Sequence, residues 1–368
     1  MNHRERVLSA LERKGYDRIP VRHFGEPEVN QALMQHFGVD SELAMLDCIG
    51  DDFRYIWPDY IGPPPQTFPD GSFEIAWPWR WQSGERYKIV EVGGKKYTEE
   101  VYRPFVDLKD PDELAKYPFP TVDWLDYSKI KQKVQLNAQY TRMAGYGNVL
   151  NFIAGISHSL GMERTLAGFA TGDPVLLALM DVKFKFHCEE IEKTLQAAEG
   201  AIDLVGIGED LGTQRGPLIS PRAFDKYIAP YLDRFFRMVH GYGARISMHC
   251  CGSSRAFVPR LVELGLDILE VIQVSCPGMN LAQLRAEFGQ RLCLSGSMDV
   301  QGFMVTETPL GIEREVRRRL EMFPDGGLIL GPSHLIQPDV PLENILTMYR
   351  AAGSLECSDS APDARGTA

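Results

Sequence analysis

Three side chains that could bind a soft metal ion follow two short apolar segments of the chain. His249 and Cys251 come directly after an apolar run at 244–248, and His334 follows another at 327–331. Short apolar runs of this kind are typical of buried strands. Two imidazoles and one thiolate suit zinc, and a zinc ion with three protein ligands keeps a fourth position open for chemistry. The pattern therefore predicts a catalytic metal centre at the ends of strands.

The spacing of His249 and Cys251 favours a shared site. Residues two apart on an extended segment point their side chains to the same side. Cys250 then points away, and we expect it to pack as a small buried apolar residue. A His-x-Cys pair alone is more often a coincidence of structure than a metal site. His334 and the flexible backbone at Gly252 favour the metal hypothesis.

Polar groups follow five consecutive predicted strands. They are Glu209 and Asp210, His249 and Cys251, Gln273, Ser297 and Asp299, and Ser333 and His334. In a parallel barrel these strand ends meet on one rim, where such barrels hold their catalytic groups. We therefore expect Gln273 and Asp299 to bind substrate, although Asp299 could instead cap a helix.

Glu209 and Asp210 are the candidate catalytic acids. Adjacent residues on a strand face opposite ways, so we expect at most one of them in the site. We favour Asp210, as a general acid/base or a fourth metal ligand; the alternative is that it caps the following turn. His23 and His158 each follow an earlier predicted strand and are second candidates for substrate binding.

Composition restricts the class of protein. The chain has 368 residues, a net charge of −11 and a pI near 5.3, which disfavour nucleic-acid binding because phosphates need a basic face. No apolar run approaches the roughly 20 residues of a membrane-spanning helix. The seven cysteines are odd in number and irregularly spaced, and no secretory signal precedes them. These features predict reduced cysteines in a soluble, cytoplasmic protein.

Strand and helix patterns alternate along the second half of the chain and predict a parallel sheet. The expected strands are 149–153, 203–207, 244–248, 267–272, 291–295 and 327–331. The expected helices are 162–170, 174–199, 221–241, 254–264, 280–287, 309–322 and 341–352. No Gly-x-Gly-x-x-Gly motif opens a helix after the first strand, so a dinucleotide-binding fold lacks its phosphate signature. A closed (β/α)₈ TIM barrel fits better than a flavodoxin-like open sheet.

The ends and one insertion complete the predicted organisation. A helical extension at 1–14 precedes a short first strand at 17–21. Residues 58–105 read as a small antiparallel hairpin insertion turning at Gly93-Gly94; its aromatic residues could line a substrate mouth or simply pack a small sheet. We expect one domain over 1–353 and a disordered tail at 354–368.

Eight short motifs carry a resemblance to a known family. They are RERVLSAL (4–11), DRIPV (17–21), GEDLGTQ (208–214), ISP (219–221), HCCGS (249–253), GLDIL (265–269), GPSHLIQP (331–338) and PLENI (341–345). With these motifs the chain resembles the uroporphyrinogen decarboxylase superfamily, in particular its corrinoid, or methylcobamide, methyltransferase-like branch. The resemblance implies a single (β/α)₈ barrel with its site in the cleft at the strand C-termini.

The resemblance also implies a mechanism. Methyltransferases of this branch bind zinc through a His-x-Cys pair and a later Cys, and hold an acceptor thiol as a thiolate that attacks a cobalt-bound methyl group. His249 and Cys251 match the first two ligands, whereas His334 stands where the third is a Cys. A histidine makes the site less electron-rich, which weakens a bound thiolate. It equally allows zinc to act as a Lewis acid on a methyl ether or methylamine-type donor.

The resulting hypothesis is a zinc-dependent methyltransferase that moves a methyl group to or from a corrinoid (cobalamin) carrier. It implies a corrinoid-binding partner protein, a small-molecule methyl donor or thiol acceptor, and a possible homodimer. One alternative is a metal-free uroporphyrinogen decarboxylase. That enzyme holds its polyanionic substrate with several arginines, where segment 21–26 here has one arginine and an acidic Glu26. A second alternative is a non-catalytic corrinoid- or tetrapyrrole-binding barrel.

Overall fold

Seven parallel strands form the central sheet of the computed structural model, which describes residues 1–75, 84–92 and 95–357. Their spatial order follows the chain: β1, β6, β7, β8, β9, β10, β11. Their bounds are Phe53–Ile56, Thr141–Ala144, Leu204–Gly208, Arg245–His249, Ile268–Ile272, Cys293–Met298 and Leu328–Pro332. All seven are largely buried, as expected for strands covered on both faces.

A short extended segment around Val21 lies between the last strand of the sheet and the first. Val21 pairs in parallel with Leu330 of β11, and its carbonyl accepts the backbone N–H of Asp52, which directly precedes β1. The segment thus takes the eighth position of the barrel. These contacts confirm the predicted α/β barrel, but the short first strand predicted at 17–21 is present only as the single bridge at Val21.

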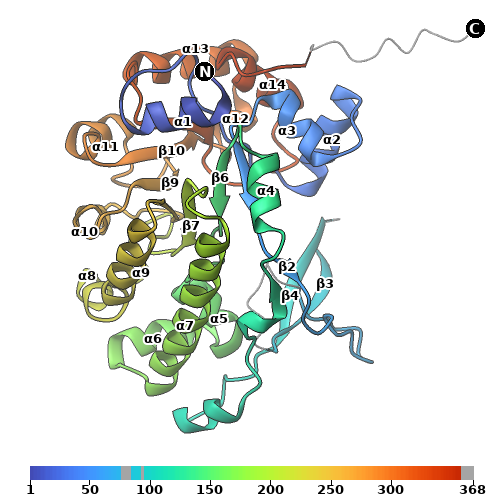
Figure 1. Ribbon diagram of the computed structural model, residues 1–368, viewed down its shortest axis with the longest axis vertical. Coiled ribbons are helices and arrows are strands. Elements are labelled where there is room, and N and C mark those ends of the chain that lie inside the picture. The colour runs from blue at the N-terminus through green and yellow to red at the C-terminus, as the bar shows by residue number, and fades with distance from the viewer. Residues whose placement is uncertain (76–83, 93–94, 358–368) are drawn as a thin grey trace, which may run out of the picture.

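Helices surround the strands (Figure 1). They are α1 (His3–Leu11), α2 (Pro27–Phe37), α3 (Glu42–Ile49), α4 (Ile130–Leu136), α5 (Phe152–Leu160), α6 (Met162–Thr171), α7 (Pro174–Ala197), α8 (Pro221–Ala223), α9 (Ala229–Gly241), α10 (Val258–Leu264), α11 (Leu281–Phe288), α12 (Phe303–Thr306), α13 (Pro309–Met322) and α14 (Leu342–Ala351). A π-helical turn, Phe224–Ile228, joins α8 to α9. Asp173 caps α7 by accepting the N–H groups of Val175 and Leu176, as its position before Pro174 predicts.

One predicted strand is wrong. Residues 149–153 do not form a strand, apart from a single bridge between Leu150 and Gly208. The strand of this unit is β6, which ends eight residues before α5 begins. Asn151 adopts a left-handed backbone and its side chain accepts the N–H of Ala154, so the apolar run that follows begins helix α5. His158 consequently lies on a helix and not after a strand.

The predicted hairpin insertion is present. Strands β3 (Arg86–Val92) and β4 (Lys95–Tyr102) pair antiparallel, while the expected turn at Gly93-Gly94 lies outside the described residues. The hairpin stands at the edge of the molecule in Figure 1. A second small ribbon pairs β2 (Asp59–Tyr60) with β5 (Leu125–Asp126), and two 3₁₀ turns, Pro111–Lys116 and Val122–Trp124, lie between hairpin and barrel in sequence.

The ends of the chain bear on the predicted organisation. We propose that residues 1–353 are one domain, because a single cluster of buried apolar side chains includes residues from Ile19 to Ala352. Most of the tail predicted to be disordered, 358–368, lies outside the described residues. By length and apolarity no single described helix qualifies as a membrane span; α6 and α7 qualify only as a pair, and they are bent by 102°.

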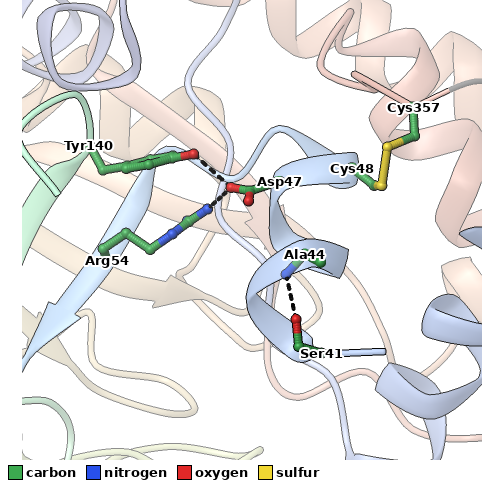
Figure 2. Close-up of a disulfide and its surroundings, with 7 residues drawn as sticks. All are labelled: Ser41, Ala44, Asp47, Cys48, Arg54, Tyr140 and Cys357. Carbon is green, nitrogen blue, oxygen red and sulfur yellow. Dashed lines mark hydrogen bonds and ion pairs between the residues drawn. A yellow bond between two sulfur atoms is a disulfide. The ribbon is translucent and has the colours of Figure 1, made fainter. Parts of the chain in front are cut away.

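The expectation that all seven cysteines are reduced is wrong. Cys48 on α3 forms a disulfide with Cys357, and Figure 2 shows the bond between the helix and the C-terminal segment. The segment is also hydrogen bonded to the helix end, because the N–H of Glu356 donates to the carbonyl of Cys48. The partners lie far apart in the sequence, so their spacing gave no sign of this pairing.

Candidate metal centre

His249, Cys251 and His334 converge at the rim where the strands end. His249 is the last residue of β8, Cys251 follows it by two residues, and His334 lies two residues beyond β11. One ligand atom from each lies within 4.8 Å of the other two, and no other group of three among the described residues was found to meet this condition. The structure therefore brings together the three residues proposed as metal ligands.

The local backbone explains how Cys251 reaches His249. The Nε2 atom of His249 lies 3.1 Å from the sulfur of Cys251, while Cys250 between them is fully buried, as expected. Gly252 has a φ of 73°, and a Cβ there would lie 2.7 Å from the carbonyl oxygen of Thr213. Only glycine therefore allows the chain to turn this closely after the cysteine.

The three donors suit a zinc-type ion. Tetrahedral zinc with nitrogen and sulfur ligands separates its donor atoms by about 3.5 Å, which follows from bond lengths of about 2.0–2.3 Å. The 3.1 Å contact and the 4.8 Å limit bracket this value. All three residues are half-buried, so an ion held between them would keep an open side. The residues present therefore fit a three-ligand catalytic site better than a closed structural one.

Charge in the group favours an ionised sulfur. Burial raises the pKa of the Cys251 thiol, but hydrogen bonds with His249 and His334 outweigh burial and lower it below its usual value. Burial likewise disfavours a charged His249, but its interactions with Cys251 and Glu270 outweigh this and raise its pKa well above the usual value. The geometry thus stabilises a thiolate, the form of cysteine that binds metals.

Glu270, in the middle of β9, is a site residue that the sequence analysis missed. Its side chain is 1% exposed, and its Oε1 lies 3.6 Å from the Nδ1 of His249. Neither atom has a closer hydrogen-bond partner in the described part of the chain. A carboxylate on Nδ1 holds the proton there and leaves Nε2 free to bind a metal. A lone Glu in the apolar stretch ILEVI was the available signal, because a buried charge needs a partner.

The two candidate catalytic acids occupy different environments. Asp210 lies beside the group, since its Oδ1 accepts the backbone N–H of Cys251 at 3.0 Å. Glu209 is fully buried and accepts the backbone N–H groups of Phe152 and Ile153 at the start of α5. Burial raises the pKa of Glu209 to about 8. The two carboxylates face different ways. Only Asp210 contacts the group formed by His249, Cys251 and His334, which we call the metal-type group.

Gln273 and Asp299, predicted to bind substrate, both bond to the backbone near the rim. Gln273 is buried and accepts the N–H of Gly252, so it supports the turn after Cys251. Asp299 accepts the N–H groups of Gly302 and Phe303, each at 3.1 Å. It therefore serves the competing role of capping α12, and its other oxygen accepts a hydrogen bond from the hydroxyl of Ser275 at 3.1 Å.

The structure does not bring His23 and His158 into the group of three. The ring of His23 is buried between helices, bonded to the hydroxyl of Tyr349 on α14 and to the side chain of Asn30 on α2. His158 on α5 pairs with Glu100 of the hairpin strand β4. Each histidine thus has polar partners elsewhere in the fold.

Fold and site together define an α/β barrel with a candidate metal centre on its rim. Residues 191–355 match the uroporphyrinogen decarboxylase (URO-D) family. This range contains β7 through α14 and with them all three residues of the metal-type group. This match over somewhat less than half of the chain confirms the resemblance predicted from the motifs.

One solved structure extends the similarity of fold beyond the matched range. A methyltransferase from Methanosarcina mazei is 15% identical, with a TM-score of 0.64 over 96% of this chain and 98% of that chain. A B12-independent methionine synthase from Shewanella sp. W3-18-1, solved in complex with selenomethionine, is 13% identical, with a TM-score of 0.38 over 73% and 72% of the two chains. A comparison with curated proteins finds no significant match. The first similarity agrees with a barrel over nearly the whole chain.

Proposed function

We propose that the protein is a zinc-dependent methyltransferase that moves a methyl group to or from a corrinoid carrier. The observation that carries this proposal is the convergence of two imidazoles and one thiol at the strand ends. The family match supports it, and so does the shared fold with the Methanosarcina mazei methyltransferase. The substrate at the metal is a thiol acceptor or a small methyl donor, and the carrier is presented by a corrinoid-binding protein that docks on the rim.

Each residue of the group has a distinct role in this proposal. His249 through Nε2, Cys251 through its sulfur and His334 through its ring hold the metal. When bound, zinc would supply Lewis-acid chemistry that lowers the pKa of a bound thiol or polarises a methyl donor. Glu270 keeps the proton on Nδ1 of His249. Asp210 fixes the backbone of Cys251 and is placed to accept or donate a proton at the rim.

The one arginine of segment 21–26 does not support the alternative function of a uroporphyrinogen decarboxylase. Arg22 is 3% exposed and forms an ion pair with Glu270. A buried, paired guanidinium is not free to hold the carboxylates of a porphyrinogen. We therefore keep methyl transfer as the proposed function. The partner protein and a homodimer remain part of the proposal.

Metal analysis and a methyl-transfer assay test the function together. We expect about one zinc per chain in the wild-type protein, and a large loss in Cys251→Ser and His334→Ala. Cys250→Ala is the matched control, because this buried neighbour points away from the group and should leave the zinc in place. Loss of methylcobalamin absorbance in the presence of a thiol would report transfer.

Three results would contradict the proposal. Full zinc content in Cys251→Ser would place the ion elsewhere. Conversion of uroporphyrinogen by the protein would establish the decarboxylase instead. A cobalamin-induced spectral change with no transfer to any thiol, and none from any methyl donor, would leave a non-catalytic binder.

A further inference from the structure

Arg22 is a buried cation that is paired with Glu270, the carboxylate next to His249. Its guanidinium is 3% exposed and lies over the rings of four aromatic residues at 4.5–5.5 Å from their centroids. These residues are Phe24, Phe53, Tyr55 and Tyr146. Its Nη1 atom donates to Oε2 of Glu270, and its Nη2 atom donates to the hydroxyl of Tyr55. Burying a cation this deeply is unfavourable unless it is paired and surrounded by such partners.

The carboxylate of Glu270 joins this cation to the histidine of the site. One of its oxygens, Oε2, is held by Arg22, while the other, Oε1, faces the Nδ1 atom of His249 at 3.6 Å. Ser247 on β8 also donates to Oε2, at 3.4 Å. The carboxylate is therefore fixed from the side opposite the histidine. A fixed carboxylate fixes the plane and the tautomer of the imidazole that it contacts.

The aromatic rings around Arg22 reach the same histidine. Tyr146 stacks on Phe24 at 5.4 Å and meets the ring of His249 edge-on at 5.8 Å. The ring of His249 is thus supported on its Nδ1 side by the carboxylate and on its flank by Tyr146. Both supports contact the guanidinium of Arg22.

We propose that Arg22 is a positioning residue of the metal centre, which acts through Glu270 to present Nε2 of His249 to the ion. This inference rests on the metal centre of the proposed function. It differs from a substrate-binding role, because the guanidinium is buried and its partners are protein groups. Arg22 lies on the segment that closes the barrel. The backbone of Pro20 to Arg22 bonds to Leu330 of β11 and to Asp52 before β1, so the same three residues close the barrel and position the proposed ligands.

Substitution of the arginine tests the proposal through metal affinity. We expect Arg22→Gln to weaken zinc binding by about 10-fold, the lower end of the effect of losing a direct partner of a ligating histidine, because Arg22 acts through Glu270. Arg22→Lys should recover only part of the affinity, because an ammonium cannot donate to Glu270 and Tyr55 through a planar fork. Competition with a chromophoric chelator measures both. Cobalt(II) in place of zinc adds a visible spectrum that reports ligand geometry, and we expect its bands to shift in Arg22→Gln.

Arg54→Gln is the matched control. Arg54 on β1 is equally enclosed, 5% exposed, paired with Asp47 and stacked 3.8 Å from the ring centroid of Tyr140. Figure 2 shows Arg54 and Tyr140 meeting Asp47 of α3. Its loss should destabilise the fold without changing zinc affinity or the cobalt spectrum. If Arg54→Gln lost as much zinc affinity as Arg22→Gln, general destabilisation would explain both losses, and the proposal would be overturned.

The remaining outcomes separate this inference from the proposed function. Wild-type affinity and an unchanged cobalt spectrum in Arg22→Gln would overturn the positioning role while leaving the metal centre intact. Failure of the wild-type protein to bind zinc or cobalt would overturn the metal centre itself, and the role of Arg22 with it. A double variant, Arg22→Gln with Glu270→Gln, should be no weaker than Glu270→Gln alone if the arginine acts through the carboxylate.

Discussion

His249 is the residue on which the proposed chemistry depends most, because both of its ring nitrogens face a functional group. Nε2 faces the sulfur of Cys251, and Nδ1 faces Glu270. His334 completes the donor set with a second imidazole. Compared with a set of one imidazole and two thiolates, this set leaves one more unit of positive charge at a zinc ion. An ion of higher charge is the stronger Lewis acid, and the thiolate that it holds is the weaker nucleophile.

His23 predicts a dependence of stability on pH. Burial lowers the pKa of His23 to about 4, whereas in the unfolded chain it is about 6.5. Between these values the unfolded chain binds a proton that the folded protein does not. The contribution of His23 to stability is therefore complete above pH 6.5 and is lost as the pH falls towards 4, at up to about 1.4 kcal/mol per pH unit.

Urea unfolding of the wild type and His23→Gln between pH 4 and 7.5 checks this expectation. The difference in unfolding free energy between the two proteins should shrink as the pH falls through that window. The comparison is made with a variant because burial raises the pKa of Asp51 to about 6, and this group gives the opposite slope in both proteins. A difference that stays constant with pH would show that His23 does not titrate as its burial requires.

The convergence of the three proposed ligands could be predicted from the sequence because each is a metal-binding side chain placed just after an apolar run. Glu270 could not be found in this way. It lies inside such a run. The pattern of apolar residues alone does not show whether a charged residue there is buried with a partner or interrupts the strand. Arg22, its partner, is about 250 residues away in the chain, and no local pattern joins the two.

At the scale of elements, the start of helix α5 explains the burial of Glu209. The last residue of β7 directly precedes it, and its carboxylate accepts two N–H groups of the first turn of the helix. Such groups have no partner within a helix and need one from elsewhere. Glu209 therefore joins a strand to a helix, and it faces the fold and not the metal-type group.

Substitution of Glu209 tests this structural role. We expect Glu209→Ala to lower the free energy of unfolding by about 1–3 kcal/mol, because two buried N–H groups lose their acceptor. Glu209→Gln keeps one carbonyl acceptor and should cost less. Chemical denaturation measures both, and zinc content should be unchanged in Glu209→Gln. Loss of methyl transfer in that variant at wild-type stability and zinc content would instead assign Glu209 to the chemistry.

Most strands of the second half could be predicted because continuous apolar runs alternate with helical patterns from β7 onward. β6 could not, because it contains Arg142, a residue that argues against a buried strand. The structure resolves the conflict by pairing this arginine with Asp203, just before β7. The run at 149–153 is apolar enough for a strand, but Asn151 in its middle starts a helix.

At the scale of the whole molecule, the disulfide between Cys48 and Cys357 ties the C-terminal segment to α3. Asp47, the neighbouring residue, binds Arg54 and Tyr140 on the other side of the helix (Figure 2). The helix is thus anchored on both sides. The C-terminal segment also lies against Gly50, where a Cβ would overlap the carbonyl of Ser354 at 2.0 Å.

Loss of the disulfide should lower stability by about 2–5 kcal/mol, as for the removal of a native disulfide. We expect Cys357→Ser to unfold at lower temperature than the wild type without reductant, and at the same temperature with it. Cys188→Ser is the control, because this cysteine is free and half-buried. Thiol titration of the denatured, unreduced protein should find five free thiols. Seven would show that the bond does not form.

The contact between Val21 and Leu330 has a consequence for how the protein is made. The barrel closes through a segment near the start of the chain that pairs with one of the last strands to be synthesised. During synthesis the edge of the segment at Val21 therefore remains unpaired until residue 330 has emerged from the ribosome. Exposed strand edges recruit other chains, so the nascent polypeptide is most prone to misassembly just before its synthesis is complete.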